Sequence, residues 1–171
     1  MNIEIEMNIR GVEENDESHG GLPANMVASK IGGQQTEAKM QIKFTSVPVD
    51  DQEKALQFYT KVLGFSKMAD IPMGEFRWLT VVSPEGVDGV ELVLEPMGFA
   101  PARDYQKALF GAGIPAMALI SKDIQAEFQR LKARGVVFRG EPQEQGMITT
   151  VLFEDGCGNL VNLVQPKPME R

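Results

Sequence analysis

Hydrophobic and polar positions follow the same order twice along the C-terminal three quarters of this chain. In each copy, an apolar run is followed by an acidic residue, an amphipathic stretch, a glycine and a second apolar run. Each copy then ends in a turn and a matching apolar segment, residues 91–95 in the first copy and 162–165 in the second. A repeat of this kind predicts that one supersecondary unit occurs twice in the fold.

The ends of the two predicted helices carry local signals. Asp50 or Asp51 caps the first helix and Asp123 caps the second, because a carboxylate at this position accepts hydrogen bonds from the free N–H groups of the first turn. Gly64 and Gly135 follow the last helical residues, where glycine readily takes a left-handed conformation. These signals predict where each helix begins and ends.

Apolar spacing between these signals predicts the elements themselves. Helices are predicted over 52–63, 102–110 and 124–134. Strands are predicted over 42–49, 65–69, 76–83 and 90–95 in the first copy, and over 116–120, 136–138, 147–154 and 159–165 in the second, with a polar loop over 139–146. Pro48 points to a sheet edge or a strand end. The order is βαβββ twice, and mixed strands with few helices predict an α+β fold.

The chain divides into a leader over 1–40 and a domain over 41–168. The domain comprises module one (41–96), a linker (97–113) and module two (114–168). The leader contains no Phe, Trp or Tyr, so it buries too little apolar surface to offset its ordering entropy, and we expect it to be disordered or mobile. A true start at Met40, or a short element that docks on a partner, are the alternatives.

Charge and cysteine content narrow the functional classes. The formal net charge of −7 gives no electrostatic support to nucleic-acid binding. No apolar run approaches the ~20 residues that a membrane span needs. Cys157 is the only cysteine, so no intramolecular disulfide forms, and the N-terminus lacks the basic and apolar regions of a signal peptide. We expect a cytoplasmic protein, in which Cys157 is an inert residue of a Gly-Cys-Gly turn.

The order of these elements and several motifs closely resemble the vicinal oxygen chelate superfamily, which includes glyoxalases, bleomycin-resistance proteins and extradiol dioxygenases. The motifs are Val-Asp-Asp at 49–51, Ala-Leu-Gln-Phe-Tyr-Thr-Lys-Val-Leu-Gly-Phe at 55–65, Arg-Leu-Lys-Ala-Arg-Gly at 130–135 and Asp-Gly-Cys-Gly-Asn-Leu-Val-Asn at 155–162. The resemblance covers about residues 41–167. It implies two βαβββ modules in a cupped mixed sheet whose concave face holds a ligand, and it implies a homodimer.

The resemblance also implies where a family metal would bind. Enzymes of this family take one ligand from each of four strands, at positions that correspond here to Phe44, Glu91, Ala116 and Asn162. Only Glu91 is a strong ligand, because Asn162 offers a weak carbonyl oxygen and the other two offer none. We therefore expect no metal cofactor of the family type.

Two further observations bear on the metal. The only histidine, His19, lies in the leader, so the two-histidine, one-carboxylate iron site of an oxygenase cannot be built within the domain. A hard cation such as magnesium, held by Glu91, Glu95 and waters, remains as the alternative.

The candidate site residues follow from the implied cleft. Phe44, Trp78 and Met147 are candidate apolar walls, and Glu91 and Asn162 are candidate polar anchors. Small or aliphatic residues complete the candidate ligand-binding set, which is Phe44, Ser46, Trp78, Glu91, Val93, Ala116, Met147, Thr150 and Asn162. Packing in the core is the alternative for the aromatic residues. Arg77 neighbours Trp78 and should point to the opposite face of its strand.

Three functions remain open from the sequence. The first is a metal-free protein that binds a small hydrophobic or aromatic molecule. The second is an enzyme, a lyase, isomerase, hydrolase or dioxygenase-like protein acting on a small carbonyl or thiol adduct, with Glu91 as catalytic base or metal ligand. The third is an interaction module that uses the acidic leader to recruit a partner. Neither nucleic acid nor a membrane is an expected partner.

Overall fold

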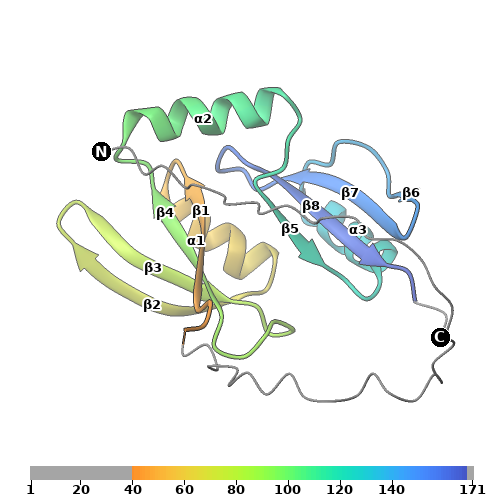
Figure 1. Cartoon of the computed structure of the whole chain (residues 1–171), viewed down its shortest axis with the longest axis horizontal. Helices are drawn as coiled ribbons and strands as arrows, with labels where there is room; N and C mark the ends of the chain where they lie inside the picture. Colours follow the sequence, from red (N-terminus) through yellow and green to blue (C-terminus); the bar gives the residue numbers. More distant parts are fainter. Residues whose placement is uncertain (1–39, 169–171) are drawn as a thin grey trace, which may run out of the picture. The chain divides into compact units, whose positions relative to one another are not determined.

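The computed structural model of the protein describes residues 40–168, which belong to one compact unit (Figure 1). The first module comprises β1 (Phe44–Val49), α1 (Gln52–Gln57), the π-helical turn η1 (Phe58–Val62), β2 (Ser66–Met73), β3 (Phe76–Val82) and β4 (Glu91–Pro96). Helix α2 (Ala100–Gly111) leads to the second module, which comprises β5 (Met117–Ile120), α3 (Ile124–Ala133), β6 (Gln143–Gln145), β7 (Ile148–Glu154) and β8 (Leu160–Pro166). The interpretations made for 1–39 fall outside the described residues.

Each module forms a mixed four-stranded sheet. Sheet A has the strand order β1-β4-β3-β2 and sheet B has the order β5-β8-β7-β6. The first strand of each module is parallel to the last, and the remaining neighbours are antiparallel. The predicted α+β fold is confirmed, and β1, which contains Pro48, lies at the edge of its sheet as expected.

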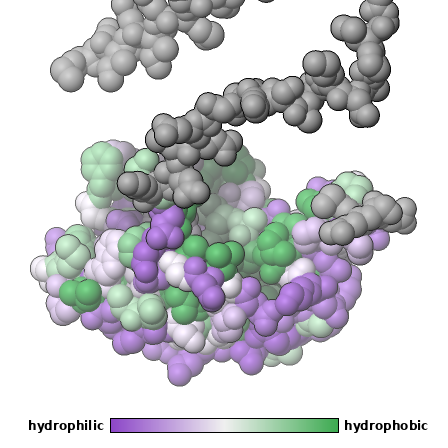
Figure 2. All heavy atoms as spheres, turned by 60° about the horizontal axis from the view of Figure 1, so that its bottom comes forward, coloured by the Kyte–Doolittle hydropathy of each residue, from purple (hydrophilic) through white to green (hydrophobic). Residues whose placement is uncertain are grey.

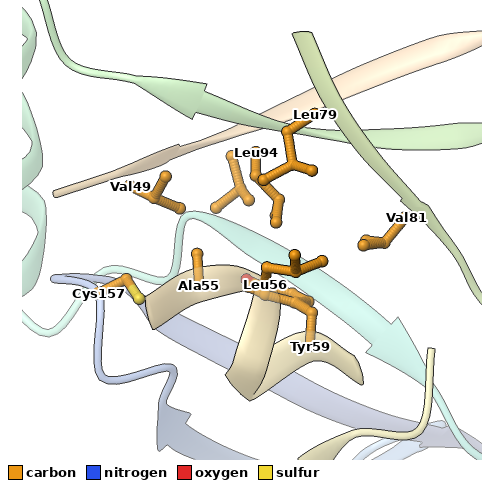
Figure 3. Close-up of a cluster of buried hydrophobic side chains, with 9 residues drawn as sticks. Val49, Ala55, Leu56, Tyr59, Leu79, Val81, Leu94 and Cys157 are labelled. Carbon is orange, nitrogen blue, oxygen red and sulfur yellow. The ribbon is translucent and has the colours of Figure 1, made fainter. Parts of the chain in front are cut away.

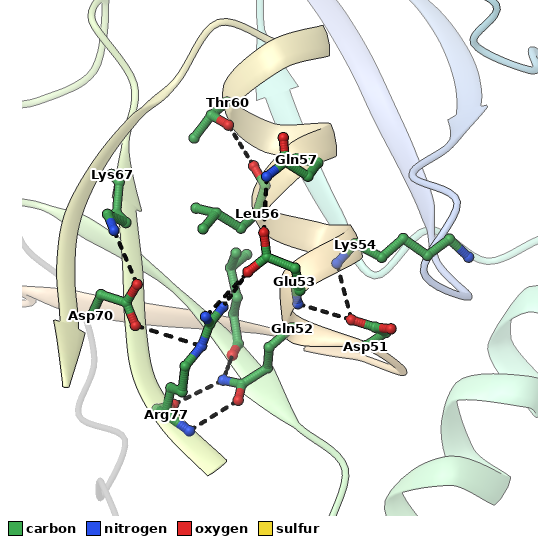
Figure 4. A network of polar contacts seen from close by, with 11 residues as sticks. Asp51, Gln52, Glu53, Lys54, Leu56, Gln57, Thr60, Lys67, Asp70 and Arg77 are labelled. Atoms are coloured by element: carbon green, nitrogen blue, oxygen red, sulfur yellow. Dashed lines mark hydrogen bonds and ion pairs between the residues drawn. The ribbon is translucent and has the colours of Figure 1, made fainter. Parts of the chain in front are cut away.

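The helix boundaries follow the local signals in the sequence. Asp51 Oδ1 accepts hydrogen bonds from the backbone N–H groups of the first turn of α1 at 2.9 and 3.0 Å (Figure 4). Asp123 Oδ1 caps α3 in the same way at 2.9 Å. Gly64 and Gly135 have φ angles of 88° and 82°, the left-handed conformation predicted for residues that follow a helix.

Apolar side chains form two adjoining cores on the helix-covered faces of the sheets. The core of sheet A comprises Val47, Val49, Ala55, Leu56, Tyr59, Leu79, Val81, Leu94 and Cys157 (Figure 3). The core of sheet B comprises Ile124, Phe128, Leu131, Val136, Val151, Phe153, Val161 and Leu163. Phe58, Leu63 and Met117 pack against both cores. The helix-covered faces of the two sheets therefore share one apolar interior.

Two segments of the second module differ from the sequence prediction. Residues 136–138, predicted as a strand, contribute only an isolated bridge between Phe138 and Phe153. The predicted polar loop over 139–146 contains the strand β6, which pairs with β7. Gln143, Glu144 and Gln145 carry no apolar pattern, so this strand owes its formation to its neighbour and not to its own residues.

The helix between the two modules and the short lengths of the described helices agree with the sequence analysis. The linker helix predicted over 102–110 is present as α2, Ala100–Gly111. None of the helices in the described range is both long enough and apolar enough to cross a membrane.

Candidate functional site

The strands of sheet A divide their side chains between two faces. Val47, Leu79 and Leu94 point into the core beneath α1. Because side chains alternate along a strand, the positions next to them lie on the opposite face, which we call the open face of sheet A. It carries Phe44, Ser46, Trp78, Thr80, Glu91 and Val93. The strands thus bring together the predicted site residues of the first module and add Thr80, which was not predicted.

Phe44 and Trp78 meet on this open face although β4 separates their strands. Their ring centroids lie 5.3 Å apart and their planes are inclined at 79°. In the β1–β4 pair, Phe44 is the partner of Glu91, two residues before Val93. In the β3–β4 pair, Thr80 is the partner of Val93, and Trp78 lies two residues before Thr80. Val93 is only 4% exposed, while Phe44 is 45% exposed. The aromatic pair therefore covers Val93 and presents an aromatic surface outward.

Glu91 is held by a hydrogen-bond relay that begins at a β-bulge. The register of β2 against β3 shifts between Lys67 and Ala69. There the Ala69 N–H donates to Thr80 Oγ1 at 3.1 Å, and the Thr80 hydroxyl donates to Glu91 Oε2 at 2.6 Å. Glu91 is 8% exposed. Lys43 Nζ lies 4.0 Å from Glu91 Oε1, beyond hydrogen-bond distance.

Asn162 and Thr150 occupy in sheet B the positions that Glu91 and Thr80 occupy in sheet A. Thr80 pairs with Val93, two residues after Glu91, and Thr150 pairs with Val164, two residues after Asn162. The Thr150 hydroxyl donates to Asn162 Oδ1. With Ala118, the register partner of Asn162, these residues mark what we call the open face of sheet B. The repeat therefore places a threonine–carboxylate pair on one module and a threonine–amide pair on the other.

Two predicted residues of the second module are not brought to Asn162. Ala116 precedes β5 and packs partly against the core of sheet A. The register pairs Asn162 with Ala118 instead. Met147 precedes β7, and by alternation along the strand it falls on the side of the buried Val151.

The two open faces do not meet within one chain. Phe58, Leu63 and Met117 fill the space between the helix-covered faces of both sheets. Each open face lies on the far side of its sheet from this shared interior. Glu91 and Asn162 are therefore on separate surfaces of the described unit.

The residues at the positions implied for a family metal do not form a ligand set. Phe44 and Ala116 offer no donor atom, and Glu91 Oε2 and Asn162 Oδ1 already accept hydrogen bonds from threonines. Within residues 40–168 there is no group of three His, Cys, Asp or Glu side chains that could hold a metal ion. His19 lies outside the described residues. The donor set thus does not fit the metal of the family enzymes.

Arg77 lies on the opposite side of β3 from Trp78, as predicted. Its backbone N–H donates to Gln52 Oε1 at 3.0 Å, and its guanidinium lies 3.1 Å from Glu53 and 3.5 Å from Asp70 (Figure 4). These contacts tie α1 to sheet A, so Arg77 belongs to the structural side of the sheet.

A buried polar network joins the modules at the loop after β7. Asp155 Oδ1 accepts the N–H groups of Cys157 and Asn159 at 2.8 and 3.0 Å. Its Oδ2 accepts from Asn159 Nδ2 at 2.7 Å and from the Tyr59 hydroxyl at 3.2 Å. Burial raises the pKa of Asp155 above its ordinary value, and these hydrogen bonds oppose that shift. Burial, and then Asp155, raise the pKa of Tyr59 well above its ordinary value.

Gln106 extends this network to α2. Its Nε2 lies 2.9 Å from the Pro48 carbonyl and 3.0 Å from both the Cys157 carbonyl and Asn159 Oδ1. Asn159 was predicted only as a turn residue, and no pattern in the sequence pointed to Gln106. Their partners lie far away along the chain, which is why local signals do not find them.

Cys157 is expected to be unreactive in the folded protein. The side chain is fully buried in the core of sheet A, and burial, with Asp155 as the next cause, raises its pKa from 9.0 to about 12 (Figure 3). The thiolate is the nucleophile, so iodoacetamide at pH 8 should leave the native protein unmodified. Mass spectrometry should find one adduct after unfolding in urea, and rapid modification of the native protein would contradict this burial.

The raised pKa of Cys157 determines how the stability of the protein changes with pH in the alkaline range. Because the folded pKa of Cys157 is raised, its contribution to stability is complete below about 9 and is lost as the pH rises toward 12. The variant Cys157→Ala is the control, since it lacks this component while other alkaline titrations remain.

The chain is similar to known proteins in both sequence and structure. A model of the Glyoxalase/Bleomycin resistance protein/Dioxygenase superfamily matches residues 41–163. The protein YurT of Bacillus subtilis (strain 168) is 51% identical over 126 residues, which cover 74% of this chain and 99% of YurT.

Two crystal structures share the fold. UcmS2 is similar with a TM-score of 0.64 and 31% sequence identity, over 74% of this chain and 98% of UcmS2. TnmS3 from Streptomyces sp. CB03234, described as an antibiotic binding protein, is similar with a TM-score of 0.59 and 34% identity, over 76% of this chain and 98% of TnmS3.

Proposed function

The chain belongs to the glyoxalase/bleomycin resistance protein/dioxygenase superfamily, and we propose that it binds a small hydrophobic or aromatic molecule on the open faces of its sheets, without the family metal. The observation that carries the proposal is the Phe44–Trp78 pair beside Glu91. Aromatic rings supply a large apolar contact surface, and a single carboxylate within it orients a ligand. The similarity to TnmS3 supports a small molecule as the ligand.

The surface of the described unit supports binding of an apolar ligand. Figure 2 shows hydrophobic residues in the middle of one face, interspersed with hydrophilic ones. On the open face of sheet A, the neighbours of the aromatic pair include Ile71, level with Trp78 and 55% exposed. Exposed apolar surface of this kind marks a binding region when it surrounds a few polar groups.

A second copy of the chain would complete the site. Each chain carries the two halves of a cleft on separate surfaces, so neither half encloses a ligand alone. A twofold dimer that places sheet A of one copy over sheet B of the other would create two identical sites, each with Glu91 from one copy and Asn162 from its partner. The separation of the open faces favours this homodimer over a cleft formed within one chain.

Native mass spectrometry tests the proposal directly. For the full chain purified without chelators or a histidine tag, we expect a homodimer without bound metal that carries an additional small-molecule mass. Such a mass survives because a ligand enclosed between two faces dissociates slowly. About one divalent metal ion per chain would overturn the metal-free site and favour a metal-dependent enzyme, and a ligand-bound monomer would overturn the shared cleft.

A matched pair of variants connects this mass to the site. Phe44→Ala should lose it, because half of the aromatic pair is removed. Phe99→Ala is the control, since Phe99 is an exposed aromatic residue at the start of α2, outside the strands of sheet A. Equal loss in both variants would show that the mass is bound elsewhere.

A further inference from the structure

We infer that the ligand presents an N–H or O–H donor to Glu91, and that Thr80 sets this requirement by fixing the carboxylate. The inference rests on the proposed function and specifies the chemical class of the ligand. It assigns Thr80 as a positioning residue, which acts on the ligand through Glu91.

The direction of the Thr80 hydroxyl follows from its two partners. A backbone N–H only donates, so the Ala69 N–H, at 3.1 Å, occupies the Thr80 oxygen as acceptor. The hydroxyl hydrogen is then available for Glu91 Oε2 at 2.6 Å. Thr80 is completely buried, so water does not compete for this hydrogen. The described residues offer this hydrogen no other acceptor, so Thr80 must donate to residue 91 or leave a buried hydroxyl hydrogen unpaired.

The β-bulge is the origin of this direction. In a regular antiparallel ladder, the Ala69 N–H would pair with a backbone carbonyl of β3. The register shift between Lys67 and Ala69 leaves this N–H free to bond the Thr80 side chain instead. The donor at the start of the relay thus belongs to the backbone, which cannot rotate as a side chain can.

The remaining oxygen of Glu91, Oε1, forms a long ion pair with Lys43 but accepts no hydrogen bond from the described residues. Lys43 Nζ is 4.0 Å away from it. Glu91 lies level with Phe44 on the open face, so a molecule resting on the aromatic pair covers it. A covered acceptor without a hydrogen-bond donor is unfavourable, so a ligand that supplies the donor is preferred.

The same geometry predicts that Glu91→Gln changes which ligands the site prefers, from those with a hydrogen-bond donor to those with an acceptor. Since Thr80 must donate, it holds the amide oxygen introduced by the substitution, and the amide NH₂ turns toward the ligand. The site then offers a donor where it offered an acceptor. In the double variant E91Q/T80V the amide is free to turn either way, so the inverted preference should disappear.

The experiment uses 2-naphthol, which carries an O–H donor, and 2-acetylnaphthalene, which carries only an acceptor. Calorimetric titration of the full chain measures the dissociation constants, and the indole N–H resonance of Trp78, the only tryptophan, shows that each probe reaches this face. We expect wild type to prefer 2-naphthol about tenfold, as one hydrogen bond allows. E91Q should prefer 2-acetylnaphthalene, and E91Q/T80V should show no strong preference.

Each outcome has a separate meaning. If neither probe shifts the Trp78 resonance, the proposed binding function of this face fails. If both bind but E91Q keeps the preference of wild type, the inference about Thr80 and Glu91 is overturned while the binding function stands. Thr45→Val is the control, because Thr45 is exposed on β1 on the other side of the strand from Phe44, and it should leave the ratio unchanged. E91Q alone decides the question if T80V fails to fold.

Discussion

Replacing Asp155 with alanine is expected to lower the free energy of unfolding by at least about 3 kcal/mol, because each buried donor left without an acceptor costs about 1–3 kcal/mol. The substitution removes the acceptor from the N–H groups of Cys157 and Asn159, from the Asn159 amide and from the Tyr59 hydroxyl. Urea unfolding at fixed protein concentration, followed by the fluorescence of Trp78, measures the loss. A loss below about 1 kcal/mol would show that the network contributes little.

Asp155→Asn serves as the control and gives the sign of a pH effect. Burial raises the folded pKa of Asp155, so its contribution to stability is full below the ordinary value of 3.8 and is lost as the pH rises through the folded pKa. The amide does not titrate, so the stability advantage of wild type over Asp155→Asn should shrink as the pH rises through this range. An advantage that grows with pH would contradict the direction of the shift.

Replacing Gly158 with alanine is expected to be much more destabilising than replacing Gly156. Both residues have a left-handed φ, 93° and 72°, which costs about 1–2 kcal/mol for a residue with a Cβ. At Gly158 the new Cβ would also lie 2.7 Å from Gln106 Oε1, whereas at Gly156 the nearest atom is Lys54 Cε at 3.9 Å. Crowding of a packed interior adds about 1–3 kcal/mol.

The comparison of the two glycine variants isolates the contact with α2. Urea unfolding of both variants measures the difference, because the backbone penalty is shared. Equal losses would mean that the Gln106 side chain moves aside without cost. In that case Gln106 would not be a fixed link between α2 and the loop after β7.

The two modules could be predicted because their determinants are local. Asp51 and Asp123 accept hydrogen bonds from the turn that follows each of them, and Gly64 and Gly135 adopt the backbone conformation that ends a helix. Such signals act within a few residues and are visible in a single sequence. The strand β6 had no such signal, because its only determinant is pairing with β7.

The candidate site was predictable for one module and less so for the other. The positions implied by the family resemblance pointed to Phe44, from its spacing to Asp51, and to Glu91 on the closing strand, and the register pairs these two residues. In module two, the same spacing of seven residues before the helix cap pointed from Asp123 to Ala116, but the residue level with Asn162 lies only five residues before Asp123. A count along the chain does not reveal such a difference, so the register partner of Asn162 is Ala118.

Thr80 and Gln106 could not have been found from the sequence for a different reason. The role of Thr80 depends on a β-bulge at Ala69, and bulges have no dependable signature in one sequence. Gln106 owes its importance to carbonyl groups of Pro48 and Cys157, and every residue offers a carbonyl. What made these residues important was the arrangement of the backbone around them.

The outer strands of sheet A bear on how copies of this protein aggregate. Pro48 lies in β1 and Pro72 in β2, the two edges of the sheet. Proline supplies no N–H for a neighbouring strand, so each edge resists extension by a strand from another molecule. Continuous growth of sheet A into a fibre is thereby hindered. Face-to-face contact between two copies, in contrast, buries the open faces of both, so that association ends at a dimer.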